Sequence, residues 1–489
     1  MSPHTRRISQ RFAVGAVFVA AMFMSIMDAT IVNVALPTIG RTFHVLPTAV
    51  SAVSISYLVS LAVFIPASGW LGDRLGGKRV LLGAIVIFTL ASALCGLAAN
   101  MTELVVFRIL QGIGGGMLAP VGMAMLYRVF PPADRVRAAS ILTVPTALAP
   151  ALGPVLGGLL VSDLSWRWVF YVNLPIGIAV FIFGLCVLES VPQKSPGRFD
   201  LPGFLLAGLG LGLVMYGVSS GPSRSWVDPD VLATIAAGVV LLAWLVRYEL
   251  RTTDPLIDFR LLTNPLFRTG TGVILLTTAA LLGLLYVITL FYQDGRGLSA
   301  LQAGLSTFPE AIGVMVGAQL ASRLIYPRLG PRRHAAIGNL GMAVFIALLA
   351  LVGVHTSLWV PRLFLFGMGI FLGQTFVPIQ AASFATISPA ATGRASTMFN
   401  AVRQLGGAVG VAAFTTVVVA VGAVHVVGHR AVADLTSYHA AFLTAAGFAV
   451  LGALLSLRIH DAEAISTMPG RRRETADRAA PPHGLALEG

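Results

Sequence analysis

Long apolar runs, separated by short polar segments, follow one another along almost the whole chain. Each run is about 20 residues long, which is the length that an α-helix needs to cross roughly 30 Å of hydrocarbon. The pattern therefore predicts an all-α integral membrane protein with fourteen transmembrane helices. The expected spans lie at about 12–36, 48–70, 80–99, 104–126, 138–161, 168–188, 201–219, 231–248, 267–291, 301–325, 334–353, 359–381, 396–421 and 438–458.

Polar segments divide these spans into groups of six, two and six. A linker with Pro192, Lys194 and Pro196 follows the sixth span, and a charged loop follows the eighth. The stretch from His460 onward is polar, so we expect it to be disordered. The predicted order is a cytoplasmic N-terminus at 1–11, a six-helix bundle at 12–188, a linker with two extra transmembrane helices at 189–266, a second six-helix bundle at 267–458 and a disordered cytoplasmic tail at 459–489.

The two groups of six share a short repeated pattern. Arg108 opens the fourth span of the first group, and Pro-Ala-x3-Arg-Ala follows it at 132–138. Arg362 opens the corresponding span of the second group, and Pro-Ala-x3-Arg-Ala follows it at 389–395. Parallel six-helix repeats with a substrate cavity between them are a recurring transporter plan. The pattern therefore suggests two pseudo-symmetric halves.

The composition agrees with a membrane protein. Of 489 residues, 56% are hydrophobic and 11% are charged, whereas a soluble domain carries about 25% charged residues. The 33 Lys+Arg exceed the 20 Asp+Glu, which in a soluble protein would suggest nucleic acid, but the positive-inside rule explains it here. Basic clusters fall in alternate loops near 74–79, 128–137 and 328–333. We therefore expect a multi-pass plasma-membrane protein with both termini cytoplasmic and no nucleic-acid partner.

A glycine-rich basic loop joins the second and third spans. Its sequence from Gly72 to Lys78 approaches a nucleotide-binding Gly-x4-Gly-Lys loop, but Arg79 replaces the required Ser or Thr and no strand precedes it. The glycines allow a tight turn, and the charge of Asp73 is favoured near the start of a helix. The ordered spacing resembles the loop motif of the major facilitator superfamily, and this resemblance implies a gate rather than an ordinary basic loop. The gating motif comprises Gly69, Asp73, Arg74, Gly76, Lys78 and Arg79.

The fifth span contains an unusual concentration of proline and glycine. Proline removes a backbone hydrogen-bond donor, and glycine lacks the side chain that keeps neighbouring helices apart. Both are unfavourable in a transmembrane helix that serves only to cross the membrane. We expect this helix to bend and to pack closely against the opposite half. The residues concerned are Pro150, Gly153, Pro154, Gly157 and Gly158.

Several of these motifs together resemble one family. The segment from Met27 to Pro37, Met-Asp-Ala-Thr-Ile-Val-Asn-Val-Ala-Leu-Pro, is similar to the first-helix signature of the fourteen-helix drug:proton antiporters of the major facilitator superfamily, the QacA/EmrB type. The segments at 165–177, 199–203 and 400–407 resemble further signatures of that family. The Gly-Pro motif of the fifth span resembles its antiporter motif, which implies export rather than uptake. The copy of the loop motif in the second half, at 322–332, lacks the Asp.

Asp28 and Arg108 are the main candidates for proton coupling. Asp28 lies in the middle of the first span, where an unpaired carboxylate is costly and is a functional candidate by default. The alternative is a structural partner for Thr30, Asn33 or a neighbouring helix. Arg108 lies in a segment that resembles the family's fourth-helix motif, which implies an interaction with a nearby acid. The alternative is an arginine that extends to the membrane surface.

Glu310 is a further candidate for proton coupling and for substrate binding. It follows Pro309 some way into the tenth span, and the alternative is an interfacial carboxylate at a helix N-terminus. Aromatic and amide side chains complete the expected cavity, although most aromatic residues in spans face lipid or neighbouring helices. The predicted cavity residues are Asp28, Asn33, Gln111, Glu310, Tyr292, Phe376 and Asn400.

The sequence as a whole favours a proton-driven exporter of hydrophobic, cationic compounds that works by alternating access. The alternative is a dedicated exporter of one endogenous metabolite, such as an antibiotic, amino acid or lipid. A membrane enzyme would need clustered His, Asp and Glu, or a nucleophile with a base, and we find neither. We expect a monomer in membrane lipid that handles small molecules and protons, with no cofactor and no metal.

Overall fold

The computed structural model describes residues 9–45, 50, 52–190, 198–422, 424–427, 430–433 and 435–468, and almost all of them are helical. The first group of helices comprises α1 (Gln10–Phe43), α3 (Ala52–Leu75), α4 (Gly77–Leu97), α5 (Met101–Val129), α6 (Pro132–Asp163), α7 (Trp168–Tyr171) and α8 (Asn173–Val187). Two helices follow, α9 (Leu201–Arg224) and α10 (Pro229–Glu249). The last group comprises α11 (Pro265–Leu290), α12 (Ala300–Leu320), α13 (Tyr326–Leu349), α14 (Trp359–Ser383), α15 (Thr392–Val421) and α16 (Thr436–Ser456).

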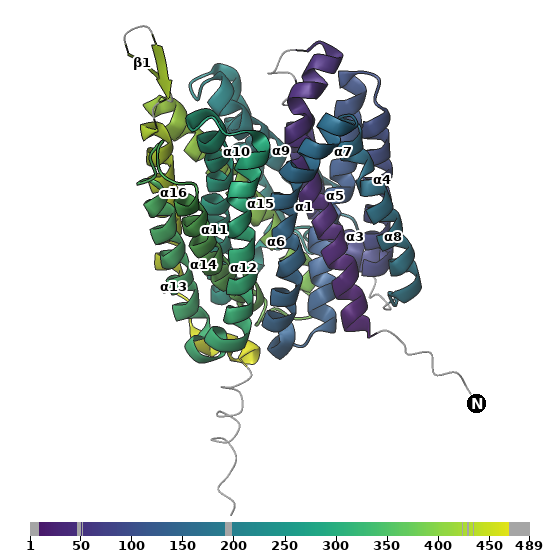
Figure 1. The fold of residues 1–489 in the computed structure, drawn as a ribbon. Coiled ribbons are helices and arrows are strands. Elements are labelled where there is room, and N and C mark those ends of the chain that lie inside the picture. The colour runs from purple at the N-terminus through teal and green to yellow at the C-terminus, as the bar shows by residue number, and fades with distance from the viewer. Residues whose placement is uncertain are drawn as a thin grey trace, which may run out of the picture.

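Short elements connect or extend these helices. The 3-10 helix η1 (Phe259–Thr263) precedes α11, and the strands β1 (Val424–Val427) and β2 (Arg430–Ala433) form an antiparallel hairpin between α15 and α16. Single π-helical turns, η2 (Phe291–Gly295) and η3 (Ala321–Ile325), end α11 and α12. We call α1 and α3–α8 the N-terminal group and α11–α16 the C-terminal group. The helices stand side by side in one bundle, and α1 begins at its lower end (Figure 1).

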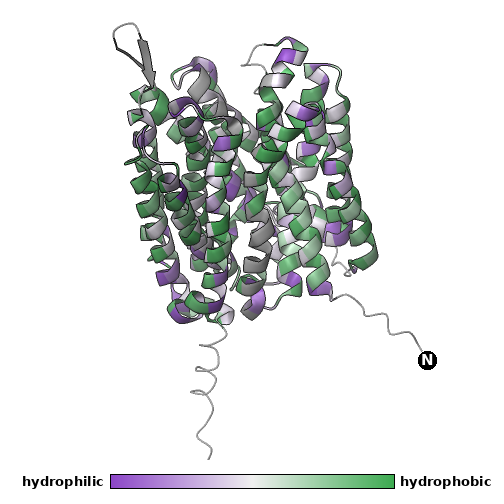
Figure 2. Ribbon diagram, in the orientation of Figure 1, coloured by the Kyte–Doolittle hydropathy of each residue, from purple (hydrophilic) through white to green (hydrophobic). Residues whose placement is uncertain are grey.

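Eleven helical segments among the described residues are long and apolar enough to cross a membrane. Helices α7 and α8 together form one of these segments. Of the fourteen spans that the sequence predicts, the three that correspond to α6, α12 and α13 are not among them. Most residues along the helices are hydrophobic, and many of the hydrophilic residues lie near the helix ends (Figure 2). The fold is therefore that of an all-helical, multi-pass membrane protein.

Side chains at the helix starts satisfy backbone groups that the helices leave free. Asn100 accepts a hydrogen bond from the backbone N–H of Glu103 at the start of α5. Ser299 and Gln302 form a capping box at the start of α12. Gly76, between α3 and α4, has a φ of +89°, a backbone conformation that side chains disfavour, so this turn requires glycine.

The two groups repeat the same packing. In the N-terminal group α5 packs against α3 and α4, and in the C-terminal group α14 packs against α12 and α13. Both contacts depend on glycine: a Cβ at Gly116 would lie 2.5 Å from the carbonyl oxygen of Leu61 in α3, and one at Gly317 would overlap the carbonyl oxygen of Ile370 in α14. The repeated packing agrees with the repeat in the sequence.

The helices α9 and α10 form a pair at the side of the bundle. Helix α9 packs against α3 and also against α15, so it contacts both groups. A Cβ at Gly208 would lie 2.9 Å from the side chain of Val63, and Trp226, just after α9, donates a hydrogen bond to Thr416 of α15. Helix α10 packs mainly on α9.

The segment after α16 is ordered for longer than the sequence suggests. Residues Asp461–Thr467 form a 3-10 helix, η4, whose Thr467 side chain contacts the hydroxyl of Tyr326 at 2.6 Å. Asp461 accepts a hydrogen bond from the backbone N–H of Arg332 at 2.9 Å. The predicted start of a disordered tail at 459 is therefore too early, because these contacts attach the segment to α13. The rest of that expected tail, 469–489, lies outside the described residues.

Candidate functional site

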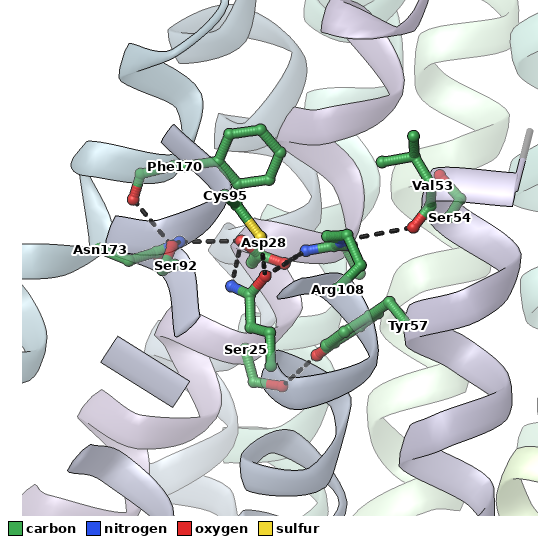
Figure 3. Close-up of polar contacts among 12 residues, drawn as sticks. Ser25, Asp28, Val53, Ser54, Tyr57, Ser92, Cys95, Arg108, Phe170 and Asn173 are labelled. Atoms are coloured by element: carbon green, nitrogen blue, oxygen red, sulfur yellow. Dashed lines mark hydrogen bonds and ion pairs between the residues drawn. The ribbon is translucent and has the colours of Figure 1, made fainter. Parts of the chain in front are cut away.

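A buried ion pair lies at the centre of the N-terminal group (Figure 3). Nη1 of Arg108 in α5 lies 2.6 Å from Oδ2 of Asp28 in α1, and both side chains are at most 1% exposed. Oδ1 of Asp28 accepts hydrogen bonds from Gln111 at 2.9 Å and from Asn173 of α8 at 2.8 Å. Both oxygens of the carboxylate thus accept hydrogen bonds from buried donors.

Other side chains hold the two charges in place. The guanidinium of Arg108 donates from Nε to the carbonyl oxygen of Val53 at 3.2 Å and lies 4.2 Å from the centre of the Tyr57 ring. The hydroxyl of Tyr57 is 3.0 Å from that of Ser25, one turn before Asp28. The site therefore joins α1, α3, α5 and α8, and a change of charge at Asp28 would act on the packing of all four.

The structure places Arg108 beside an acid, Asp28, and buries it rather than extending it to the surface; its role in proton coupling stays a prediction. The site also contains residues that the sequence analysis did not select. Asn173 belongs to the segment 165–177, which was noted only as a resemblance, and Tyr57 carried no signal beyond being a polar aromatic residue within a span. Asn33, predicted for the cavity, lies apart from the ion pair: its side chain is exposed and accepts a hydrogen bond from Ser54.

Glu310 is buried in the C-terminal group without a hydrogen bond or ion pair to any described residue. It is the eleventh residue of the 21-residue helix α12 and is 9% exposed. It therefore lies in the middle of the helix, and the alternative of an interfacial carboxylate at the helix N-terminus is wrong. Arg362 of α14 donates to the hydroxyl of Ser306, one turn from Glu310, at 3.2 Å.

The remaining predicted cavity residues do not form one cluster with Asp28. Asn400 in α15 is 1% exposed; its Nδ2 donates to the carbonyl oxygen of Ser396, and its Oδ1 has no partner among the described residues. Tyr292 lies in the core of the C-terminal group at 0% exposure, and no described residue bonds its hydroxyl. Phe376 is partly buried and packs on that core. Within the part of the chain that the structure describes, the C-terminal group thus holds several buried polar atoms without a hydrogen-bond partner.

The gating motif joins the two groups at the lower end of the bundle. Asp73 accepts a hydrogen bond from Arg128 of α5 at 2.7 Å. A Cβ at Gly393, in the first turn of α15, would lie 3.3 Å from both carboxylate oxygens of Asp73. Asp73 lies near the end of α3, so the prediction that it belongs to the start of the next helix is wrong. Its charge instead faces the N-terminus of a helix in the other group, where a negative charge is favoured.

Further contacts between the groups lie near this one. The hydroxyl of Ser396 donates to the carbonyl oxygen of Pro120 at 2.8 Å, and Arg135 donates to that of Phe384 at 2.9 Å. A Cβ at Gly69 would lie 2.7 Å from the hydroxyl of Thr397, so α3 and α15 are in direct contact. The lower end of the bundle is therefore closed by contacts between the two groups.

The other residues of the gating motif have different surroundings. Lys78 donates to the carbonyl oxygen of Leu185 at the end of α8 at 3.0 Å, which ties the loop to its own group. Arg74 and Arg79 are exposed, and neither has an ion pair among the described residues. Asp73 and Gly69 are thus the residues of this motif for which the described part of the chain shows a contact with the opposite group.

The glycines of the Gly-Pro motif face α1 of their own group. A Cβ at Gly153 would overlap the hydroxyl of Thr30 and lie 3.0 Å from the backbone nitrogen of Ile31. A Cβ at Gly157 would lie 3.0 Å from the Ile31 side chain, whereas Gly158 has open space around it. Helix α6 does pack against α12 and α14 of the opposite half, as expected. Gly153 and Gly157, however, lie at its contact with α1, so the expectation that these two glycines make the contact between the halves is wrong. Pro150 is partly buried on the same helix, and the side chain of Pro154 lies outside the described residues.

Comparisons with known proteins identify the family of this chain. A family profile described as Major Facilitator Superfamily matches residues 18–411. The chain belongs to the major facilitator superfamily. A protein of Mycobacterium tuberculosis named "Multidrug resistance protein B homolog" is 33% identical over 402 residues, which are 81% of this chain and 74% of that protein.

Solved structures of the superfamily share the fold. The human organic anion transporter MFSD10 (TETRAN) superposes with a TM-score of 0.67 at 17% identity and covers 91% of this chain and 99% of its own. The proton:xylose symporter XylE, bound to 6-bromo-6-deoxy-D-glucose, superposes with a TM-score of 0.63 at 16% identity and covers 91% and 95%. Membership of the superfamily makes the chain a multi-pass membrane transporter and not an enzyme.

Proposed function

We propose that this transporter is a proton-coupled multidrug exporter of the plasma membrane that moves hydrophobic, cationic compounds out of the cell by alternating access. The observation that carries the proposal is the ion pair of Asp28 and Arg108, which lies between four helices and is at most 1% exposed. Ionisable groups inside a membrane span are costly and mark ion pathways. The relative named for multidrug resistance supports the export of drugs.

The proposed topology has fourteen spans in the order six, two and six, with both termini cytoplasmic. Helices α6, α12 and α13 have 32, 21 and 24 residues, each enough to cross about 30 Å of hydrocarbon at 1.5 Å per residue. They also occupy the places of spans in the repeated packing. The six-helix bundles then lie at 12–188 and 267–458, the two extra helices lie within 189–266, and the lower end faces the cytoplasm.

Protonation of Asp28 is the proposed coupling step. The protonated carboxyl group becomes a hydrogen-bond donor and no longer neutralises Arg108. The hydrogen bonds that Arg108, Gln111 and Asn173 donate to the carboxylate are then weakened. Because Arg108 also bonds Val53 in α3 and lies over Tyr57, its release changes how α3 and α5 pack. The proton shifts the inward-open and outward-open populations only by its differential affinity for them.

The contact of Asp73 with α15 is the proposed cytoplasmic latch. It holds the lower end closed while the opposite side is accessible, and the hydrogen bonds Ser396–Pro120 and Arg135–Phe384 add to it. Opening towards the cytoplasm has to break these contacts together. Glu310 is proposed to attract a cationic substrate, because a charge interaction is far stronger in a medium of low dielectric than in water.

Transport into proteoliposomes with an imposed pH gradient tests the proposal. The substrates are a lipophilic cationic dye, a neutral dye of similar size and a panel of antibiotics, each with and without a protonophore. We expect proton-dependent accumulation of the cationic dye, collapse with the protonophore, and no effect of the control Asp254→Asn, an exposed acid without a partner among the described residues. Accumulation of the dye that does not depend on the pH gradient would contradict proton coupling. Strict selectivity for one compound would favour the dedicated exporter of one metabolite.

A further inference from the structure

The lower end of α10 has an unusual position for a membrane helix. Only 17% of the most apolar 18-residue stretch of α10 is buried in the protein, so most of this helix faces outward from the bundle. Trp244, in the last two turns, is 60% exposed. Tryptophan favours the boundary between hydrocarbon and headgroups, which places the last turns of α10 at headgroup level.

A hollow of about 320 Å³ opens at this end of the helix. It is lined by Trp244, Arg247, Tyr248, Arg251 and Thr252. Arg247 and Arg251 are one turn apart and therefore lie on the same face of the helix. Both are exposed, and neither has a carboxylate or another hydrogen-bond partner among the described residues. The hollow thus presents two unpaired guanidinium groups beside an indole ring.

The helix end that carries the hollow is held firmly. The hydroxyl of Tyr248 donates to Oδ1 of Asp200 at 3.0 Å. The Glu249 carboxylate accepts the backbone N–H groups of Leu256 and Ile257 at 3.1 Å each. Arg260 donates to the carbonyl oxygens of Leu250 and Thr252. The side chains of Arg247 and Arg251 take part in none of these bonds, so they are not used to hold the helix end in place.

An apolar track continues from the hollow towards the middle of the helix. Val240, Ala237 and Ala233 precede Trp244 at intervals of three to four residues, so they share its face. All three are exposed. The small alanines leave room for an acyl chain to lie against α10, on the side of the headgroups that faces the middle of the membrane.

We infer that this hollow binds an anionic phospholipid of the leaflet at the lower end of the bundle. The phosphate would lie between Arg247 and Arg251, whose planar forks match phosphate oxygens. The indole N–H of Trp244 would donate to the glycerol ester region, and an acyl chain would lie along Val240, Ala237 and Ala233. A basic residue near an anionic membrane surface contributes about 1 kcal/mol, so two of them correspond to roughly a thirty-fold gain in affinity.

Native mass spectrometry of the full-length protein in detergent tests the inference, with dioleoyl phosphatidylglycerol as the anionic probe and dioleoyl phosphatidylcholine as the neutral one. The wild type should retain phosphatidylglycerol in preference to phosphatidylcholine. Arg247→Gln with Arg251→Gln should weaken phosphatidylglycerol binding roughly thirty-fold and leave the melting temperature without added lipid unchanged. Trp244→Leu should weaken the retention of phosphatidylglycerol although both arginines are present.

The matched control is Arg332→Gln with Arg333→Gln. It removes the same charge from exposed positions of α13 at the same end of the bundle, and it should leave the binding of phosphatidylglycerol nearly unchanged. An equal loss in both double variants would show attraction by net charge alone and overturn the inference, as would no loss in either. Glycerol phosphate that competes as strongly as the lipid would identify a site for free phosphates instead.

Discussion

In the N-terminal group both oxygens of the central acid, Asp28, accept hydrogen bonds, whereas Glu310 in the C-terminal group has no partner among the described residues. Helix α11, which occupies in the C-terminal group the place of α1, contains no Asp or Glu. Arg362, which repeats Arg108 in the sequence, bonds the hydroxyl of Ser306 rather than an acid. One fold thus carries two different electrostatic arrangements.

We propose that the two groups have different functions, with proton coupling in the N-terminal group and substrate binding in the C-terminal group. A saturated ion pair holds one arrangement of helices until a proton changes its charge, which suits a coupling site. Buried polar atoms without partners are rare in proteins and call for an explanation; Oδ1 of Asn400 is such an atom among the described residues, and we propose that Asn400 and Glu310 meet a ligand. The predictions below test this division, beginning with the largest expected effect.

Removing the cation of the N-terminal pair should have the largest effect on stability. Arg108→Ala leaves the Asp28 carboxylate buried without its charge partner, which costs about 3–5 kcal/mol of unfolding free energy. Thermal melting in detergent should show a strongly lowered midpoint. The double variant Asp28→Asn with Arg108→Gln has no buried charge and should recover much of the loss. A single variant as stable as the wild type would rule out a tight buried pair.

Filling the glycine contact between α6 and α1 should have the next largest effect. Gly153→Leu has to displace Thr30 and Ile31, and overpacking of this kind costs about 1–3 kcal/mol. The matched control is Gly158→Leu, on the same helix, where no atom lies within 4 Å of an added Cβ. Folded protein in the membrane and its melting temperature should fall for the first variant only. If both variants fold equally well but the first leaks protons, the contact acts in coupling rather than in packing.

Breaking the contact of Asp73 with α15 should have a smaller effect than the two changes above. Asp73→Asn removes a charge at the N-terminus of α15, an interaction of about 0.3–1 kcal/mol, and it also weakens the partly exposed pair with Arg128. The inward-open population should rise by about two- to five-fold. Electron–electron distances between spin labels at positions 79 and 333, in a chain with Cys186→Ser, measure that population.

The control for the latch is Asp134→Asn, which breaks an exposed pair with Arg11 inside the N-terminal group at 3.4 Å. It should leave the distances unchanged. A distance distribution that is the same for Asp73→Asn and the wild type would mean that Asp73 does not hold the lower end closed.

The smallest effect on stability is expected at Glu310. Glu310→Gln loses no hydrogen bond to a described residue, so the melting temperature should stay close to that of the wild type. Glu103→Gln provides the comparison, because Glu103 accepts hydrogen bonds at the start of α5 from the backbone N–H of Ala99 and from Asn100. A large loss of stability for Glu310→Gln would show that the carboxyl group has a structural partner after all.

Much of the helical framework could be predicted from the sequence, because apolar length is a local property. Each expected span corresponds to a helix, and the ends at Asn100, Asp200 and Ser299 are marked by capping side chains next to the residues that they cap. The repeated Arg108 and Arg362 likewise indicated equivalent places in the two groups. Whether α6, α12 and α13 cross the membrane stays a prediction.

The partners inside the site could not be predicted in the same way. Asn173 meets Asp28 across 145 positions of the chain, and Asp73 meets the start of α15 only because the lower ends of the groups converge. The face that Gly153 presents to α1 depends on how α6 is rotated, which a motif of small residues leaves open. These are tertiary contacts, and the hydrophobic pattern of the sequence does not determine which residues of different helices meet.

Transport by two variants in the same proteoliposomes tests the division of work most directly. Uptake of a cationic and a neutral dye is measured both with an imposed pH gradient and as exchange without a gradient. Asp28→Asn should retain exchange of both dyes and lose accumulation driven by the pH gradient. Glu310→Gln should retain driven transport of the neutral dye and lose that of the cationic dye. Driven accumulation at the wild-type rate in Asp28→Asn would contradict the account, because the proton would then be carried elsewhere.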